Sequence, residues 1–231
     1  MARGRLVTTR IFFWLGLCLS VPVAQASVLT FGFQCITNNV PSQCLIGQNQ
    51  LFVDVVDDSQ SSSFGGVTVA PSSGQVGFLF YNIGPSPSVI TLVLFDDGVL
   101  SLPLSLVQVS GVSFSQVSGS PQLPGGGSLT PQFATTSGFG ADANPPPPAN
   151  GVGPGQALGI IFSLASGKTW GDVISAMGTG SLRIGLHVQA IGATDGSESF
   201  INNPNPVPEP ATLGLVGAGL ALLGWRKRKA S

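Results

Sequence analysis

Two apolar segments, one near each end of the chain, most constrain the fold, because residues that insert into a membrane are not available for the core of a folded domain. The N-terminal segment Ile11–Val23 follows a stretch, Met1–Arg10, that carries three arginines. The small residues Ala24-Gln25-Ala26 come next and offer the kind of site that signal peptidase accepts. This order predicts a signal peptide over residues 1–26, exported by the Sec machinery and cleaved after Ala26.

Two other interpretations of this end fit less well. A retained membrane anchor would need ~20 apolar residues to cross a bilayer, and Ile11–Val23 is shorter than that. A lipoprotein signal would use Leu15-Gly16-Leu17-Cys18, but Leu17 stands where a small residue should precede the cysteine. We therefore expect the mature chain to begin at Ser27.

The C-terminal end shows the reverse order of apolar and basic residues. Residues 211–225 are free of charge and are followed at once by a basic stop cluster. At ~1.5 Å per residue, a helix over 211–225 spans about 22 Å of a hydrocarbon core of ~30 Å, so we expect a weak, temporary transmembrane anchor. The cluster should remain cytoplasmic. It consists of Arg226, Lys227, Arg228 and Lys229.

The segment between the two ends is acidic. From residue 27 to residue 203 the cations are Lys168 and Arg183, against nine Asp and Glu residues. A domain of this charge is repelled by the phosphates of nucleic acid, so the composition excludes a nucleic-acid-binding role.

Two cysteines remain in the exported part, since Cys18 leaves with the signal peptide. Cys35 and Cys44 are an even pair in an oxidising compartment, which predicts a disulfide between them. It would close a short loop around Pro41.

Residues 27–201 carry a repeated strand pattern. Runs rich in β-branched and aromatic residues alternate with turn-forming clusters, which predicts an all-β fold: an antiparallel β-sandwich of jelly-roll-like type. Within the last run, Leu182, Ile184, Leu186 and Val188 alternate with polar residues, so we expect these four to face the core. The predicted strands cover 28–34, 50–56, 75–83, 89–95, 108–114, 156–164 and 181–191.

One short helix is expected among the strands, at one end of the sandwich. Thr169 is placed as its N-cap with Asp172 three residues later, ahead of apolar residues at helical spacing. The Gly- and Pro-rich residues 118–131 and 144–148 should form surface loops, because proline cannot donate to a ladder. The Asn- and Pro-rich residues 202–207 are interpreted as a stalk.

The residues that most resemble catalytic motifs do not complete one. Gly167-Lys168-Thr169 ends like a P-loop, but Phe162 stands where the first glycine is needed. His187 is the single histidine and lies on the polar face of its predicted strand, so we interpret it as a surface residue. One histidine and an oxidised cysteine pair cannot supply the ligands of a zinc site, and no GxSxG motif occurs. We predict a protein that is not an enzyme and needs no cofactor.

Two carboxylate patterns leave an alternative open. The pairs Asp57-Asp58 and Asp96-Asp97 each follow a predicted strand and are weak candidates for a calcium site at one rim of the sandwich. Turn chemistry explains the same residues equally well. A glycoside hydrolase would need two carboxylates about 5 to 9.5 Å apart, and sequence does not fix that spacing for Asp54, Asp142 or Asp172.

The C-terminal residues resemble a known sorting signal. Val207-Pro208-Glu209-Pro210, a short Gly- and Ala-rich segment and the basic cluster follow one another in the order of a PEP-CTERM signal. The resemblance, over residues 208–231, implies recognition by an exosortase, a membrane-embedded cysteine transpeptidase of exopolysaccharide-producing bacteria. It implies that Pro208, Glu209 and Pro210 form the processing motif. The second half of the exported part, including Leu182–Gln189, also resembles β-rich domains of no known activity that precede such signals.

Together these features predict a structural or interaction protein of the cell surface or extracellular matrix, reached through an inner-membrane intermediate. Signal peptidase, the Sec machinery, an exosortase and the membrane are its expected partners, and exopolysaccharide is a candidate partner. A carbohydrate-binding module is the main alternative, although the exported part keeps only Trp170 and Tyr81 among its tryptophans and tyrosines. A secreted hydrolase is the weaker one, because no nucleophile and base stand out.

Overall fold

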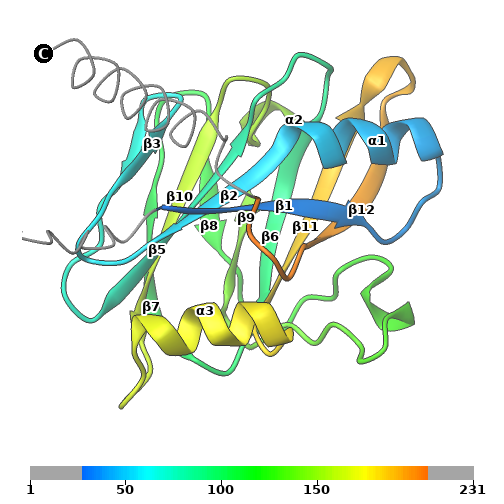
Figure 1. Cartoon of the computed structure of the whole chain (residues 1–231). Helices are drawn as coiled ribbons and strands as arrows, with labels where there is room; N and C mark the ends of the chain where they lie inside the picture. Colours follow the sequence, from blue (N-terminus) through cyan, green and yellow to red (C-terminus); the bar gives the residue numbers. More distant parts are fainter. Residues whose placement is uncertain (1–27, 208–231) are drawn as a thin grey trace, which may run out of the picture.

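The computed structural model describes residues 28–207 and is built mainly from antiparallel strands (Figure 1). This confirms the predicted all-β class. The strands are β1 (Leu29–Cys35), β2 (Leu51–Val56), β3 (Ser62–Phe64), β4 (Val67–Val69), β5 (Gln75–Asn82), β6 (Val89–Asp96), β7 (Leu100–Val107), β8 (Phe114–Gln116), β9 (Gly140–Ala143), β10 (Ala157–Leu164), β11 (Arg183–Ile191) and β12 (Gly196–Asn202). The helices are α1 (Pro41–Gln50), α2 (Pro147–Asn150) and α3 (Trp170–Thr179).

Strand β1 joins the two layers of the sandwich. Ten strands follow one another in the order β7-β10-β5-β2-β1-β12-β11-β6-β9-β8, while β3 and β4 form a separate hairpin. Residues 29–32 of β1 pair with β2, and residues 33–35 pair with β12. One strand therefore belongs to both layers, so the sandwich is a single sheet folded about β1.

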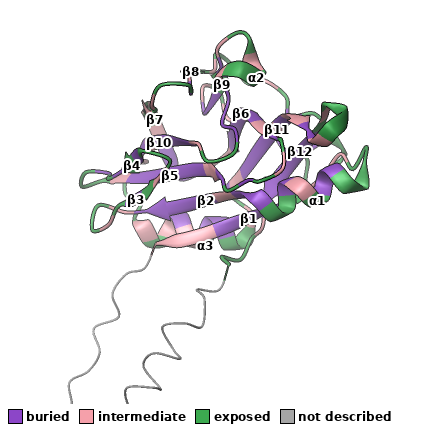
Figure 2. Ribbon diagram, turned by 90° about the horizontal axis from the view of Figure 1, so that it is seen from above, coloured by how far each residue is buried: buried purple, intermediate pink, exposed green. Residues whose placement is uncertain are grey.

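Aromatic side chains fill the space between the two layers. Phe78 of β5 lies 5.1 Å from Phe95 of β6, and Phe162 of β10 lies 4.9 Å from Phe95, measured between ring centroids. All three rings are fully buried, and Figure 2 shows buried residues along the strands with exposed residues in the connecting turns. Edge-to-face contacts of this kind join layers from distant parts of the sequence. The four predicted core residues are also buried, Leu182 just before β11 and the other three within it, which confirms which face of this strand points into the core.

Helix α3 forms where the sequence predicts it. Thr169 accepts a hydrogen bond from the Asp172 N–H, and Asp172 accepts one from the Thr169 N–H, so the capping box is complete. Val173 and Met177 pack into the core. Figure 1 shows α3 along the lower edge of the sheet and α1 along its upper edge. The P-loop-like residues before α3 therefore serve only as the turn that starts this helix.

Several predicted elements need correction. The expected strand over 108–114 is wrong, since residues 108–113 form the turn between β7 and β8 and Phe114 is the first residue of β8. Helices α1 and α2 were not predicted, so α3 is not the single helix. Strand β7 escaped prediction because Pro103 interrupts its pattern, and it lies at the edge of the sheet, where proline is tolerated. Within residues 28–207, no helix is long and apolar enough to cross a membrane.

The polar face of β11 is partly covered by the chain between β8 and β9. Leu123 and Phe133 from this connection pack over Gly185, where a Cβ atom would lie only 2.5 Å from a Leu123 methyl carbon. Arg183 lies with its guanidinium 5.5 Å from the centre of the Phe133 ring and forms an ion pair with Asp96. A glycine at position 185 thus lets a loop without regular strands pack closely on the sheet.

Candidate functional site

The junction between the folded domain and the C-terminal motif begins at the end of β12. Asn202, the last residue of the strand, is buried, and its side-chain oxygen accepts a hydrogen bond of 2.7 Å from the Ile184 N–H. Its side-chain amide donates to the Asn203 carbonyl at 3.1 Å. These bonds fix Asn202 between β11 and β1, so the chain leaves the sheet from a defined point.

Residues 203–207 continue along β1 instead of leaving it. The Asn203 N–H donates to the Gly32 carbonyl at 2.9 Å, and the Val207 N–H donates to the Thr30 carbonyl at 2.7 Å. Hydrogen bonds to the folded domain therefore continue as far as Val207, past residue 201, where the sequence places the end of the domain. The segment 202–207, which the sequence predicts to be a stalk, begins inside β12 and ends hydrogen-bonded to β1.

The beginning of β1, against which this segment lies, is held by a buried carboxylate. The Asp54 carboxylate accepts hydrogen bonds from the hydroxyl groups of Thr30 at 2.7 Å, Ser62 at 2.5 Å and Tyr81 at 3.1 Å. Burial and the nearby carboxylate raise the pKa of the Tyr81 phenol well above its usual value, so it remains a proton donor. This network joins β1, β2, β3 and β5, and it gives Asp54 a structural role.

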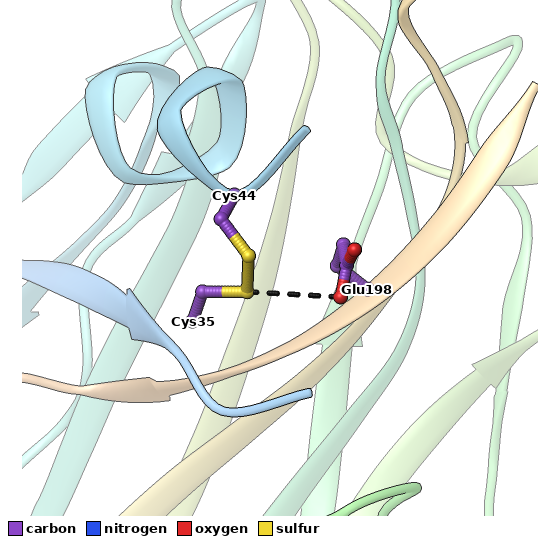
Figure 3. A group of neighbouring side chains, drawn as sticks. All are labelled: Cys35, Cys44 and Glu198. Atoms are coloured by element: carbon purple, nitrogen blue, oxygen red, sulfur yellow. Dashed lines mark hydrogen bonds between the residues drawn. A yellow bond between two sulfur atoms is a disulfide. The ribbon is translucent and has the colours of Figure 1, made fainter. Parts of the chain in front are cut away.

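The other end of β1 carries the disulfide. Cys35, its last residue, is bonded to Cys44 of α1, with the two Cα atoms 5.4 Å apart. Glu198 of β12 points at the same place (Figure 3), and its Oε2 lies 3.7 Å from the Cys35 Sγ. A disulfide sulfur has no proton to donate, so this approach is a contact and not a hydrogen bond.

Glu198 holds the start of α1. Its side chain is 1 % exposed, and its carboxylate accepts hydrogen bonds from the Val40 N–H at 2.7 Å, the Asn39 N–H at 3.0 Å and the Thr37 hydroxyl at 2.5 Å. A helix start leaves N–H groups without partners and attracts negative charge. No local sequence pattern indicates this role, because the acceptor comes from a strand far along the chain.

A metal site does not follow from this cluster. In the part of the chain that the structure describes, Cys35, Cys44 and Glu198 form the one group of three potential metal ligands, with ligand atoms within 4.8 Å of one another. The two sulfurs are bonded to each other, and the carboxylate oxygens already accept hydrogen bonds. The cluster therefore works as a structural tie between β1, α1 and β12.

Three of the four calcium candidates bind groups in their own surroundings, and the fourth, Asp58, is exposed. Asp57 accepts bonds from the N–H and hydroxyl of Ser59, which is a turn motif. Asp96 forms the ion pair with Arg183, and Asp97 accepts from the N–H groups of Val99 and Leu100. Burial raises the pKa of the Asp97 carboxyl. These residues and Asp58 do not gather into a group of three or more ligands among residues 28–207.

His187 is less exposed than the sequence suggested. Its ring lies half-buried on the outer face of β11, with Nδ1 3.1 Å from the Ser199 hydroxyl oxygen. Burial lowers its pKa, and Asp142 opposes this shift. Ser199 is fully buried, so a substrate cannot reach its hydroxyl in this arrangement. The pair is therefore a structural contact, and it does not form an accessible nucleophile and base.

Two cavities lie around the connection between β8 and β9. One has a volume of about 460 Å³ and includes Gln122 and Gln132 in its lining. The other, of about 410 Å³, includes Gln116 and Asp142, and Pro121 borders both. Asp142 is the one charged residue in either lining, and burial raises the pKa of its carboxyl. Neither lining offers a cation that would bind an anion.

The comparisons with known proteins concern the C-terminal end of the chain. Neither a curated protein nor a solved structure matches this chain. The predicted signal peptide 1–26, the processing motif 208–210, the helix 211–225 and the cluster 226–229 lie outside the described residues. The family model of the PEP-CTERM protein-sorting motif matches residues 206–229. The C-terminal resemblance is thereby confirmed: the chain carries a PEP-CTERM sorting motif, which marks an exported protein that an exosortase processes and that ends up on the cell surface or outside.

Proposed function

We propose that this chain is a non-enzymatic structural or interaction protein of the cell surface or extracellular matrix of an exopolysaccharide-producing bacterium. Its sandwich would cross the inner membrane behind the signal peptide and remain anchored by residues 211–225 until an exosortase acts at Pro208, Glu209 and Pro210. The observation that carries the proposal is the sorting motif at residues 206–229, which begins where the folded domain ends at Val207.

The described side chains support a role without catalysis. The buried carboxylates of Asp54 and Glu198 are held by hydroxyl and N–H donors inside the domain. The single histidine contacts a serine that is closed to solvent. A surface protein of this kind would act through its folded shape, with the disulfide and the capped helix α1 stabilising it outside the cell.

Cell fractionation with intact-mass measurement tests this proposal at both ends of the chain. We expect the mature protein outside the inner membrane, beginning at Ser27, with two hydrogens missing for the disulfide and without residues 211–231. A mature protein that keeps the C-terminal segment in the inner membrane would contradict the proposal. Substituting the whole basic cluster 226–229 with neutral residues provides a control, because the segment should then lose its stop and pass through the membrane.

The polar linings of the two cavities favour one further function, a carbohydrate-binding module. Their linings offer amide and hydroxyl groups, and Asp142 can accept hydrogen bonds from sugar hydroxyls. Titration of the isotope-labelled protein with neutral hexasaccharides, and with a uronic-acid oligosaccharide as a control, would test it by NMR. Shifts confined to residues around 115–135 and abolished by Gln122→Ala would favour this function over a purely structural one.

A further inference from the structure

We propose that residues 203–207, here called the latch, hold the sorting motif against the folded domain and must leave β1 before the motif is processed. This inference rests on the proposed processing and adds its regulation. The latch continues β12 in the antiparallel direction along the edge of β1. It thus couples the last strand of the domain directly to the segment that the exosortase reads.

The contacts of the latch are mostly backbone bonds. Pro204 and Pro206 have no N–H, so the latch has three backbone donors, and two of them, in Asn203 and Val207, are bound to β1. The Val207 side chain lies over Gly32, with a methyl carbon 3.9 Å from where a Cβ on that glycine would be. The bond from Val207 to Thr30 is the last of these ties and the one nearest the motif.

Little free chain separates the hydrogen bond of Val207 to Thr30 from the processing motif Pro208-Glu209-Pro210. Pro208 follows Val207 directly, so the Cα of Glu209 lies within about 7 Å of the Cα of Val207. An enzyme that binds an extended peptide usually pairs with the N–H and C=O groups on either side of its motif. On the N-terminal side, the N–H groups of Asn203 and Val207 are already bound to β1. Release of residues 203–207 would free about 17 Å of extended chain.

The latch is built to open without unfolding the domain. Residues 204–207 are exposed, with Val207 at 44 %, and the structure gives this segment no side-chain ion pair. Asn202 is the stopping point, because its buried side chain bonds to Ile184 inside the sheet. Opening therefore costs two backbone hydrogen bonds and little buried surface.

An insertion tests the latch in the full-length chain. Six Gly and Ser residues placed between Val207 and Pro208 leave the latch in place but move the motif away from the domain. Pulse labelling in a host with the exosortase should show loss of the C-terminal segment about thirtyfold faster than in the unaltered chain, the factor that the two net hydrogen bonds of the latch contribute together. The same six residues inserted beside the exposed Gly74, where an added Cβ atom would meet nothing within 4 Å, form the control and should leave the rate unchanged.

A second variant separates the latch from general effects of the insertion. Gly32→Ala adds a methyl group in ordinary contact distance of Val207 and Phe52, which should tighten the latch and slow processing. In the chain that carries the insertion, the same substitution should have no effect on processing. Hydrogen exchange of the full chain in detergent micelles should show slower exchange at residues 203–207 for Gly32→Ala, with the other strands unchanged.

Three results would overturn the inference. Equal processing rates with and without the insertion at Val207 would remove the latch and leave the proposed function intact. An equal slowing by Gly32→Ala in both chains would assign its effect to the domain and not to the latch. Retention of the C-terminal segment by every variant, including the unaltered chain, would overturn the proposed function and the latch together.

Discussion

The two ends of β1 are held to the rest of the domain by different means. At Cys35 a disulfide and the buried carboxylate of Glu198 join β1, α1 and β12. At Thr30 the Asp54 carboxylate joins β1 to β2, β3 and β5, while the latch beside this end is exposed and is attached to β1 by two backbone hydrogen bonds. The stronger end lies away from the sorting motif, and the weaker end lies beside it. A single strand can therefore belong to the permanent fold and also hold a segment that is released before processing.

Glu198 should carry the largest effect in this comparison. Glu198→Ala leaves the N–H groups of Asn39 and Val40 and the Thr37 hydroxyl without their charged acceptor, which should lower the free energy of unfolding by about 3 kcal/mol. Urea unfolding followed by circular dichroism measures this change. Asp58→Ala, which removes an exposed carboxylate, is the matched control and should stay within about 0.5 kcal/mol. Equal effects from the two variants would show that Glu198 does not hold this end.

The disulfide should contribute the next largest effect. Cys35 and Cys44 are nine residues apart in the sequence, and replacing both by serine removes the constraint that their disulfide places on the unfolded chain. The free energy of unfolding should fall by about 2 to 3 kcal/mol. The melting temperature of the purified domain should fall accordingly. Hydrogen exchange at residues 203–207 should not change, because the latch is attached at the opposite end of β1. Faster exchange there would mean that the two ends are coupled.

A smaller, pH-dependent effect is expected from His187, next to β12. Burial lowers its pKa, so the folded state binds this proton less readily than the unfolded chain does. The contribution of neutral His187 to the free energy of unfolding should be fully present above the pKa of about 6.5 that the residue has in the unfolded chain. It should be lost as the pH falls below that value. Unfolding measured from pH 7.5 to 5 should show this decline, and His187→Gln should flatten it. An identical slope in both proteins would assign the decline to other groups.

The parts of the fold that could be predicted are those whose signals are local. Helix α3 has its cap, its N3 acid and its apolar residues within one short stretch, so the sequence alone identifies it. Strand β11 shows a strict alternation whose apolar half faces the core, and it too could be read directly. Strands with continuous apolar runs, such as β5 and β10, were found for the same reason.

The parts that were missed depend on residues far apart in the sequence. Helix α1 has no side-chain cap of its own and little apolar character, and its start is completed by Glu198 from β12. Strand β12 begins with Gly, Ser and Glu, which are typical of a turn. Only the fold shows that the Glu198 carboxylate binds the start of α1. The latch looks like a stalk because its prolines suggest a free chain, while its two tertiary hydrogen bonds leave no mark in composition.

The smallest effect on stability, and the largest on processing, should come from Glu209→Gln. Glu209 follows the latch by one residue and lies outside the described domain, so its change should leave the melting temperature within about 1 °C, as surface substitutions do. Pro208 and Pro210 each fix their own φ and disfavour helix in the residue before them, which predicts an extended segment around this carboxylate. If the exosortase reads that carboxylate, the uncleaved membrane-bound precursor should accumulate. Pulse labelling of the C-terminal segment measures it, with Asp58→Asn as a charge-matched control in the domain. Normal processing of Glu209→Gln would mean that the flanking prolines and the release of the latch, and not the carboxylate, determine where the chain is cut.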